Sequence, residues 1–205
     1  MSNDLKTEAD LRTVYLEPGG GAVDKQLPML EKHSRRFIEL SPFFCIGTSR
    51  PDGLADVSPR GGEPGFVHVL QDDLLAIPDR PGNNRLDTLT NIVHSPAVGL
   101  LFFVPGVEDM LRVNGVAEIV TTPELMERFE FRGKLPRSVM LVHLKEVYIH
   151  CTKALKRSGL WDPSKQVDRS TLPTAGEMFR DQLKVDFPAK AIDESLEANA
   201  RDDLY

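Results

Sequence analysis

Two loops of this sequence combine arginine, glycine and small polar residues in the manner of phosphate-binding sites. The first loop reads Asp-Val-Ser-Pro-Arg-Gly-Gly over residues 56–62, and the second reads Pro-Asp-Arg-Pro-Gly-Asn-Asn-Arg over residues 78–85. Guanidinium groups bind phosphate oxygens in a forked geometry, and glycines let backbone N–H groups approach an anion closely. An amphipathic helix is expected after the second loop, and its N-terminus adds a partial positive charge. The two loops together predict a phosphorylated ligand.

Arg85 is the strongest candidate for a phosphate contact from its position alone. It stands at the start of the helix expected over residues 85–94, which Asn83 or Asn84 is expected to cap. A cation is unfavourable at a helix N-terminus unless an anion lies beside it. We therefore expect Arg85 to contact the phosphate of a ligand.

The apolar pattern predicts a mainly β protein with flanking helices. Short apolar segments bounded by Gly, Asp or Pro are expected as strands at residues 43–49, 65–70, 74–77, 97–104, 110–120 and 139–151, with a second hairpin strand after the turn at 50–53. This spacing is typical of a β-barrel. Helices are expected at residues 27–40, 85–94 and 189–200, and capping boxes at Thr121/Glu124 and Thr174/Glu177.

The length of 205 residues suits one domain with appendages. We expect an N-terminal arm over residues 1–26, a barrel domain over residues 27–165 and a C-terminal helical arm over residues 166–205. The C-terminal arm is expected to pack on the barrel or on a partner subunit.

Charge and cysteine content narrow the class of protein. The formal net charge of −6 offers no basic surface to nucleic acid. Cys45 and Cys151 lie far apart and outside any C-x-x-C motif, which favours free thiols in a reducing cytoplasm. No apolar run reaches the length of a membrane span. The histidines show no metal-ligand spacing, so no metal site is predicted.

Five motifs in a fixed order resemble the pyridoxamine-5'-phosphate-oxidase-like superfamily of FMN-binding split β-barrels. They are the hairpin, Ser-Pro-Arg-Gly, Gly-Asn-Asn-Arg, the strand Gly-Leu-Leu-Phe-Phe and the strand Leu-Arg-Val-Asn-Gly-x-Ala-Glu. The stretch Cys-x-Lys-Ala-x-x-Arg-Ser-x-Leu-Trp over residues 151–161 is similar to a flavoprotein subgroup that is distinct from the oxidase itself. The resemblance covers about residues 35–165.

The resemblance implies FMN as cofactor and a homodimer with FMN at the subunit interface. The loop matching residues 58–61 runs under the flavin ring in the family, and the segment matching residues 78–85 holds the ribityl chain and phosphate. The strand that begins at Met110 reaches the flavin of the second subunit. The cofactor-binding residues implied in this way are Ser58, Pro59, Arg60, Pro78, Asn83, Asn84, Arg85, Met110 and Arg112. Two basic residues after the last strand, Lys153 and Arg157, are added because their spacing allows them to approach the flavin ring.

The function expected from the resemblance is that of a cytoplasmic FMN-dependent oxidoreductase. Hydride or electrons would move between FMN and a nicotinamide or small organic substrate. No side chain stands out as a catalytic acid or base, so the chemistry is expected to belong to the cofactor. Two alternatives remain open: a flavin-binding or redox-sensing protein without turnover, and a haem-binding relative on the same barrel.

Overall fold

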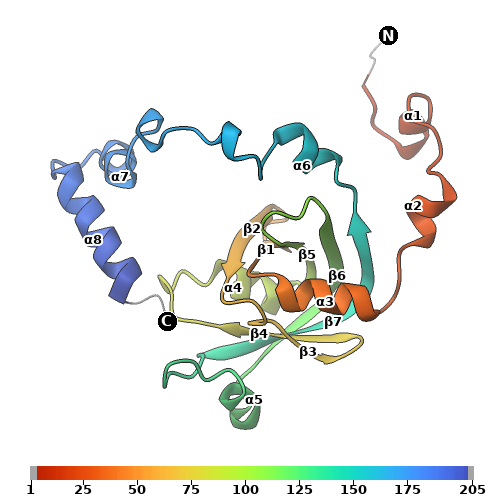
Figure 1. Ribbon diagram of the computed structural model, residues 1–205, viewed down its shortest axis with the longest axis horizontal. Coiled ribbons are helices and arrows are strands. Elements are labelled where there is room, and N and C mark those ends of the chain that lie inside the picture. The colour runs from red at the N-terminus through yellow and green to blue at the C-terminus, as the bar shows by residue number, and fades with distance from the viewer. Residues whose placement is uncertain (1–3, 203–205) are drawn as a thin grey trace.

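The computed structural model describes residues 4–202; residues 1–3 and 203–205 of the two expected arms lie outside the described part. Its centre is an antiparallel sheet of seven strands in the order β2-β1-β5-β6-β7-β4-β3 (Figure 1). The strands are β1 (Phe43–Ser49), β2 (Ala55–Gly61), β3 (His68–Gln71), β4 (Leu74–Asp79), β5 (Ala97–Phe103), β6 (Met110–Val120) and β7 (Ser138–His150). The sheet curves around a core and does not close, which confirms the predicted split β-barrel.

Helices flank the sheet and form both arms. They are α1 (Glu8–Arg12), α2 (Gly20–Asp24), α3 (Lys32–Leu40), α4 (Asp87–His94), α5 (Pro123–Glu127), α6 (Lys153–Ser158), α7 (Ala175–Leu183) and α8 (Ala189–Asp202), with the 3-10 turns η1 (Pro163–Lys165) and η2 (Arg169–Thr171). In Figure 1, α6, α7 and α8 trace an arc away from the strands, while α1 and α2 lie on the other side of the barrel. Within the described chain, no helix is both long and apolar enough to span a bilayer.

Alternation along the central strands builds the core. In β1, Phe44 and Ile46 are fully buried while their neighbours point outward. Leu100 and Phe102 of β5 are buried in the same way, and the ring centroids of Phe44 and Phe102 lie 4.9 Å apart. This period of two fixes the register, because a slip of one residue would expose the whole apolar set.

The longest strand, β7, is paired along both of its edges. One edge pairs with β6 over the length of both strands, and the other pairs with β4 only from Ser138 to His143. Beyond that point Leu27 forms a bridge to Val147, and Lys25 Nζ donates a hydrogen bond to the carbonyl of Ile149 at 2.7 Å. The N-terminal segment therefore covers a strand edge that would otherwise be open to pairing with another chain.

That bridge corrects the helix predicted over residues 27–40. The helix α3 begins at Lys32, where the Glu31 carboxylate accepts hydrogen bonds from the backbone N–H groups of His33 and Ser34. Residues 27–30 are not helical because Leu27 exchanges backbone hydrogen bonds with Val147 and the Leu30 N–H donates to the Asp72 carbonyl, with a bend at residues 28–29 between them.

Two capping predictions were also wrong in detail. The N-cap position of α4 is Leu86 and not Asn83 or Asn84, and no side chain caps this helix. The N-cap position of α5 is Thr122 and not Thr121, and its side chain makes no capping hydrogen bond. The box at Thr174/Glu177 is confirmed: the Thr174 hydroxyl accepts from the Glu177 N–H, and the Glu177 carboxylate accepts from the Thr174 N–H.

Gly115→Ala tests a close approach within the sheet. The register of β6 and β7 shifts at Asn114/Gly115, and a Cβ at Gly115 would lie 2.3 Å from the carbonyl oxygen of His143. We expect the variant to lose about 1–3 kcal/mol of unfolding free energy through overpacking. Urea unfolding measures the loss. Gly21→Ala is the control, because a Cβ there meets nothing within 4 Å; equal midpoints for the two variants would contradict the prediction.

Candidate functional site

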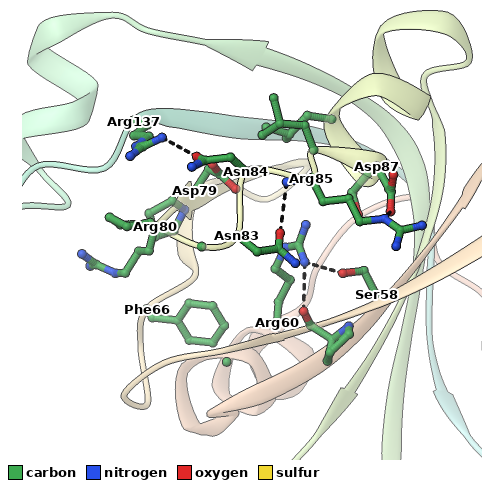
Figure 2. A pocket seen from close by; sticks show the side chains of 18 residues that line it. Ser58, Arg60, Phe66, Asp79, Arg80, Asn83, Asn84, Arg85, Asp87 and Arg137 are labelled. Carbon is green, nitrogen blue, oxygen red and sulfur yellow. Dashed lines mark hydrogen bonds and ion pairs between the residues drawn. The ribbon is translucent and has the colours of Figure 1, made fainter. Parts of the chain in front are cut away.

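A cleft of about 360 Å³ lies where the two arginine-containing loops meet (Figure 2). This volume is within the range of small-molecule sites. Its walls are the end of β2, the end of β4, the loop that follows β4, and the first turn of α4. The lining residues are Ser58, Pro59, Arg60, Gly61, Phe66, Pro78, Asp79, Arg80, Pro81, Gly82, Asn83, Asn84, Arg85, Leu86, Asp87, Thr88, Leu89 and Arg137.

A buried asparagine holds α4 against the β1–β2 hairpin and thereby brings the loops together. The Asn91 side-chain amide donates to the Thr48 hydroxyl at 2.9 Å and to the Asp56 carboxylate at 3.3 Å. Asn91 and Thr48 are both buried and cannot hydrogen-bond to water. Leaving their polar groups unpaired would lower the stability of the fold, and these bonds prevent that loss.

Strand β2 supplies the first wall of the cleft. Ser58 pairs with Ile46 and Arg60 pairs with Phe44, so both residues belong to the inward register of the hairpin. The Arg60 guanidinium donates to the Ser58 hydroxyl and, at 2.9 Å, to the Pro59 carbonyl (Figure 2). Burial lowers the pKa of Arg60, and the carboxylates of Asp79 and Asp56 partly offset this effect. Arg60 is thus a tethered, half-desolvated cation.

The loop between β4 and α4 has a strained backbone. Asn84 and Leu86 both adopt left-handed conformations, with φ of 59° and 60°. Such a conformation costs a leucine about 1–2 kcal/mol, and strain of this kind gathers at functional sites. The N-terminus of α4 has no side-chain cap, and its first turn, residues 87–89, lines the cleft.

Asparagine side chains organise this loop. The Asn83 amide oxygen accepts from the backbone N–H of Arg85 at 3.0 Å, and the Asn84 oxygen accepts from Arg137 at 2.6 Å. Arg137 itself is fixed by its backbone N–H, which donates to the Asp79 carbonyl at 3.0 Å. These bonds join the loop to the chain segment that leads into β7.

Arg85 finds an anion within its own chain. Its Nε lies 2.5 Å from Asp87 Oδ2, and its side chain is 76% exposed. Asp87 occupies the first turn of α4, where a carboxylate is favourable. The intramolecular pair therefore accounts for the position of Arg85, and its phosphate contact stays a prediction.

The cleft carries an excess of positive charge. Four arginines and two aspartates line it. Burial raises the pKa of Asp79, against the opposing effect of Arg60 and Arg137. Arg80 points away from the loop in Figure 2; it donates to the Phe129 carbonyl at 3.2 Å and its guanidinium lies 5.2 Å from the ring centroid of Phe131. The arrangement suits an anionic ligand.

The structure brings seven of the eleven predicted site residues into this cleft. They are Ser58, Pro59, Arg60, Pro78, Asn83, Asn84 and Arg85. Met110 and Arg112 lie on β6, whose outward residue Arg112 is 5.7 Å from the ring centroid of Tyr148. Lys153 and Arg157 lie on α6. None of these last four lines the cleft of its own chain.

Two lining residues, Phe66 and Arg137, lie outside both predicted loops and the helix predicted over residues 85–94, and were not predicted for this site. Phe66 stacks on Phe44 with ring centroids 5.8 Å apart, and Arg137 precedes β7. Arg137 reaches the cleft because Asp79 pairs with Ser138, a contact between distant segments that no local motif signals. Phe66 follows a glycine-containing turn and carries no motif either.

One family model matches this chain, and several solved structures are similar to it. The family model described as Pyridoxamine 5'-phosphate oxidase matches residues 30–151. HupZ of Group A Streptococcus is 17% identical with a TM-score of 0.49, over 59% of this chain and 94% of that chain. General Stress Protein 26 of Bacillus anthracis is 18% identical with a TM-score of 0.44, over 58% and 92%. A structure titled F420 Reductase is 18% identical with a TM-score of 0.43, over 59% and 98%. No curated protein matches the chain at a significant level.

Asp79→Asn tests the electrostatics of the cleft. The pKa of Asp79 is raised in the folded protein, so the folded state holds this proton more tightly than the unfolded chain. Stability from this group is present at low pH and is lost as pH rises from about 3.9 through the folded pKa. We expect ligand-free Asp79→Asn to be more stable than wild type at pH 7, and the difference to shrink towards pH 4. Urea unfolding at both pH values measures it; a variant less stable than wild type at pH 7 would contradict the sign.

Proposed function

Because the chain belongs to the pyridoxamine 5'-phosphate oxidase family, a family of flavin-related oxidoreductases, we propose that the cleft binds FMN and that the protein is an FMN-dependent oxidoreductase. The observation that carries the proposal is the excess of arginine in the cleft beside the uncapped N-terminus of α4, which suits a phosphate monoester. Bound FMN would supply hydride or electron transfer between a nicotinamide or small organic substrate and an acceptor. The chain's own residues would bind and orient it.

The phosphate would lie at the loop between β4 and α4. Asn83 and Asn84 hold the loop backbone, while Arg85 is exposed and already faces an anionic partner in Asp87. A phosphate dianion carries more charge than one carboxylate, so Arg85 can exchange Asp87 for the ligand. Arg137 adds a second cation on the other side of Asn84.

The flavin ring would lie toward β2. Ser58 and Arg60 present a hydroxyl and a tethered cation there, and Phe66 presents an aromatic ring (Figure 2). Arg60 donates hydrogen bonds to the Ser58 hydroxyl and the Pro59 carbonyl. These bonds hold its guanidinium in place before a ligand binds. A preorganised cation of this kind stabilises negative charge on a bound ring without further ordering.

We also propose a homodimer with FMN at the subunit boundary. An antiparallel sheet open to water on one side alternates apolar and polar residues. The outward residues of β5 are instead Ala97, Gly99, Leu101 and Phe103, all without a polar side chain. A partner subunit covering this face would bring its Arg112 toward the neighbouring cleft, which fits the position of Arg112 outside its own cleft.

A flavin-binding or redox-sensing protein without turnover is the second candidate. It is favoured by the composition of the cleft, whose described lining contains no histidine, cysteine or tyrosine to move a proton. The same composition disfavours haem, because those side chains are among the usual axial ligands.

The identity of the bound ligand tests the proposal directly. We expect FMN, and not FAD, to be released on denaturation, because the two compact loops lack the Gly-x-Gly-x-x-Gly turn that accepts a pyrophosphate. Mass spectrometry identifies the ligand. Rapid bleaching of the flavin by NADH or NADPH would support the oxidoreductase, whereas reduction by dithionite alone would support the second candidate. Release of FAD only would refute the proposal.

Arg85→Ala and Asp87→Asn form a matched pair that locates the phosphate. Arg85→Ala should weaken FMN binding by about 1.5–3 kcal/mol, the range for a hydrogen bond to a charged group, and leave riboflavin binding unchanged. Asp87→Asn should tighten FMN binding, because it frees Arg85 from its competitor. Fluorescence titration of both flavins measures these shifts. An equal loss for FMN and riboflavin in Arg85→Ala would show that Arg85 does not contact the phosphate.

A further inference from the structure

We infer that residues 163–202, here called the clasp, dock on the barrel of a second copy of this chain. The inference rests on the homodimer of the proposed function and names the element that holds it together. Figure 1 shows the clasp, which contains α7 and α8, standing away from the strands of its own barrel. The contacts of α7 and α8 are overwhelmingly with each other.

The two helices of the clasp form a defined unit. The backbone N–H of Gly176 donates to Asp193 Oδ1 at 2.7 Å, and a Cβ at Gly176 would lie 2.2 Å from the carbonyl oxygen of Ala189. The helices therefore cross at a glycine that lets their backbones touch. The capping box at Thr174 fixes the start of α7.

A hydrogen bond and an ion pair attach the segment just before the clasp to the loop between β5 and β6, and a local turn orders the clasp near its start. At its root, Trp161 Nε1 donates to the Val107 carbonyl at 2.9 Å and Lys156 pairs with Glu108 at 3.2 Å. Further along, Asp168 Oδ1 accepts from the Ser170 N–H at 2.8 Å. The root and the first turn of the clasp are therefore ordered before it meets another surface.

The clasp leaves a large apolar surface uncovered. Its exposed apolar side chains are Val167, Leu172, Met178, Phe179, Leu183, Val185, Phe187 and Leu196. Eight such side chains, each about half exposed, present on the order of 700 Å², close to the ~800 Å² that each partner contributes to a standard interface. A short helix pair with this surface in water is unstable by itself, so another surface must cover it.

The same chain offers a matching surface on its barrel. Phe43 of β1 is 39% exposed and pairs with Phe103 of β5, while Val57 of β2 is 68% exposed and pairs with Gly47 of β1; both lie on the outward face. In Figure 1 the clasp lies away from its own strands, so two copies related by a two-fold axis can cover each other's apolar surfaces reciprocally. A second copy is therefore the occupant that leaves neither surface open.

The first experiment measures the dimer dissociation constant of flavin-free full-length protein by sedimentation. We expect wild type to be dimeric and the double variant Phe179→Asp/Phe187→Asp to raise the dissociation constant about 100-fold or more, the effect of losing two buried aromatic anchors. Phe179→Leu/Phe187→Leu is the matched control and should stay within a few-fold of wild type. Circular dichroism confirms that each variant is folded. A monomeric wild type, or equal constants for the two double variants, would overturn the inference.

The second experiment asks whether the clasp reaches its own barrel or that of the partner. Two differently tagged chains, both carrying Cys45→Ser and Cys151→Ser, are co-expressed; one adds Phe179→Cys and the other Val57→Cys. Treatment with a short bismaleimide should link the two tags. Absence of that product, with linkage forming only when both cysteines are on one chain, would overturn the inference. A wild-type dimer that binds no FMN would refute FMN binding and leave the clasp in place. An FMN-binding monomer would overturn the clasp and the proposed homodimer and leave FMN binding in place.

Discussion

The hydrogen bonds of Asn91 are the interaction on which the cleft depends. Its amide joins α4 to Thr48 of β1 and Asp56 of β2, and so fixes the helix that follows one arginine-containing loop against the strand that carries the other. Ile92 of the same helix is buried in the core and adds an apolar attachment, while Asn91 supplies the polar one. Because the amide is buried, any movement of α4 that breaks these bonds leaves polar groups unpaired, and the geometry of the cleft is correspondingly rigid.

Repulsion between four arginines is contained because each has a different partner. Arg60 bonds to Ser58, Arg85 to Asp87 and Arg137 to Asn84, while Arg80 turns to the carbonyl of Phe129. These partners set the direction of each guanidinium but neutralise little of the total charge, since only Asp87 among them is ionised. An anion that enters the cleft is therefore attracted by cations that are already oriented. Little further ordering of side chains is needed, so less of the binding free energy is lost to conformational entropy.

The sequence predicted the parts of the site that are local and missed the parts that depend on strand pairing. Ser58 and Arg60 share a hairpin face, and Asn83 to Arg85 form one loop, so spacing alone indicated that they act together. Arg137 enters the cleft through the pairing of β7 with β4, which no neighbouring residue signals. The boundary of α3 failed for a related reason: Leu27 has a helical spacing in the sequence, but its backbone bonds to Val147 of the sheet. Tertiary pairing overrode local propensity at both positions.

The outward face of the barrel shows why the remaining predicted residues lie where they do. Gly47 of β1 pairs with Gly99 of β5, and two facing glycines leave this part of the sheet flat enough for close approach of another surface. Arg112 stands on the same face with its guanidinium 5.7 Å from the ring centroid of Tyr148, and Asn114 and Glu146, which hydrogen-bond to each other at 2.6 Å, lie next along the paired strands. The apolar side chains of β5 on this face would favour aggregation if they stayed uncovered in a monomer. Placed at a two-fold interface, the patch provides the contact area and the cation points toward the neighbouring subunit, so both features have one explanation.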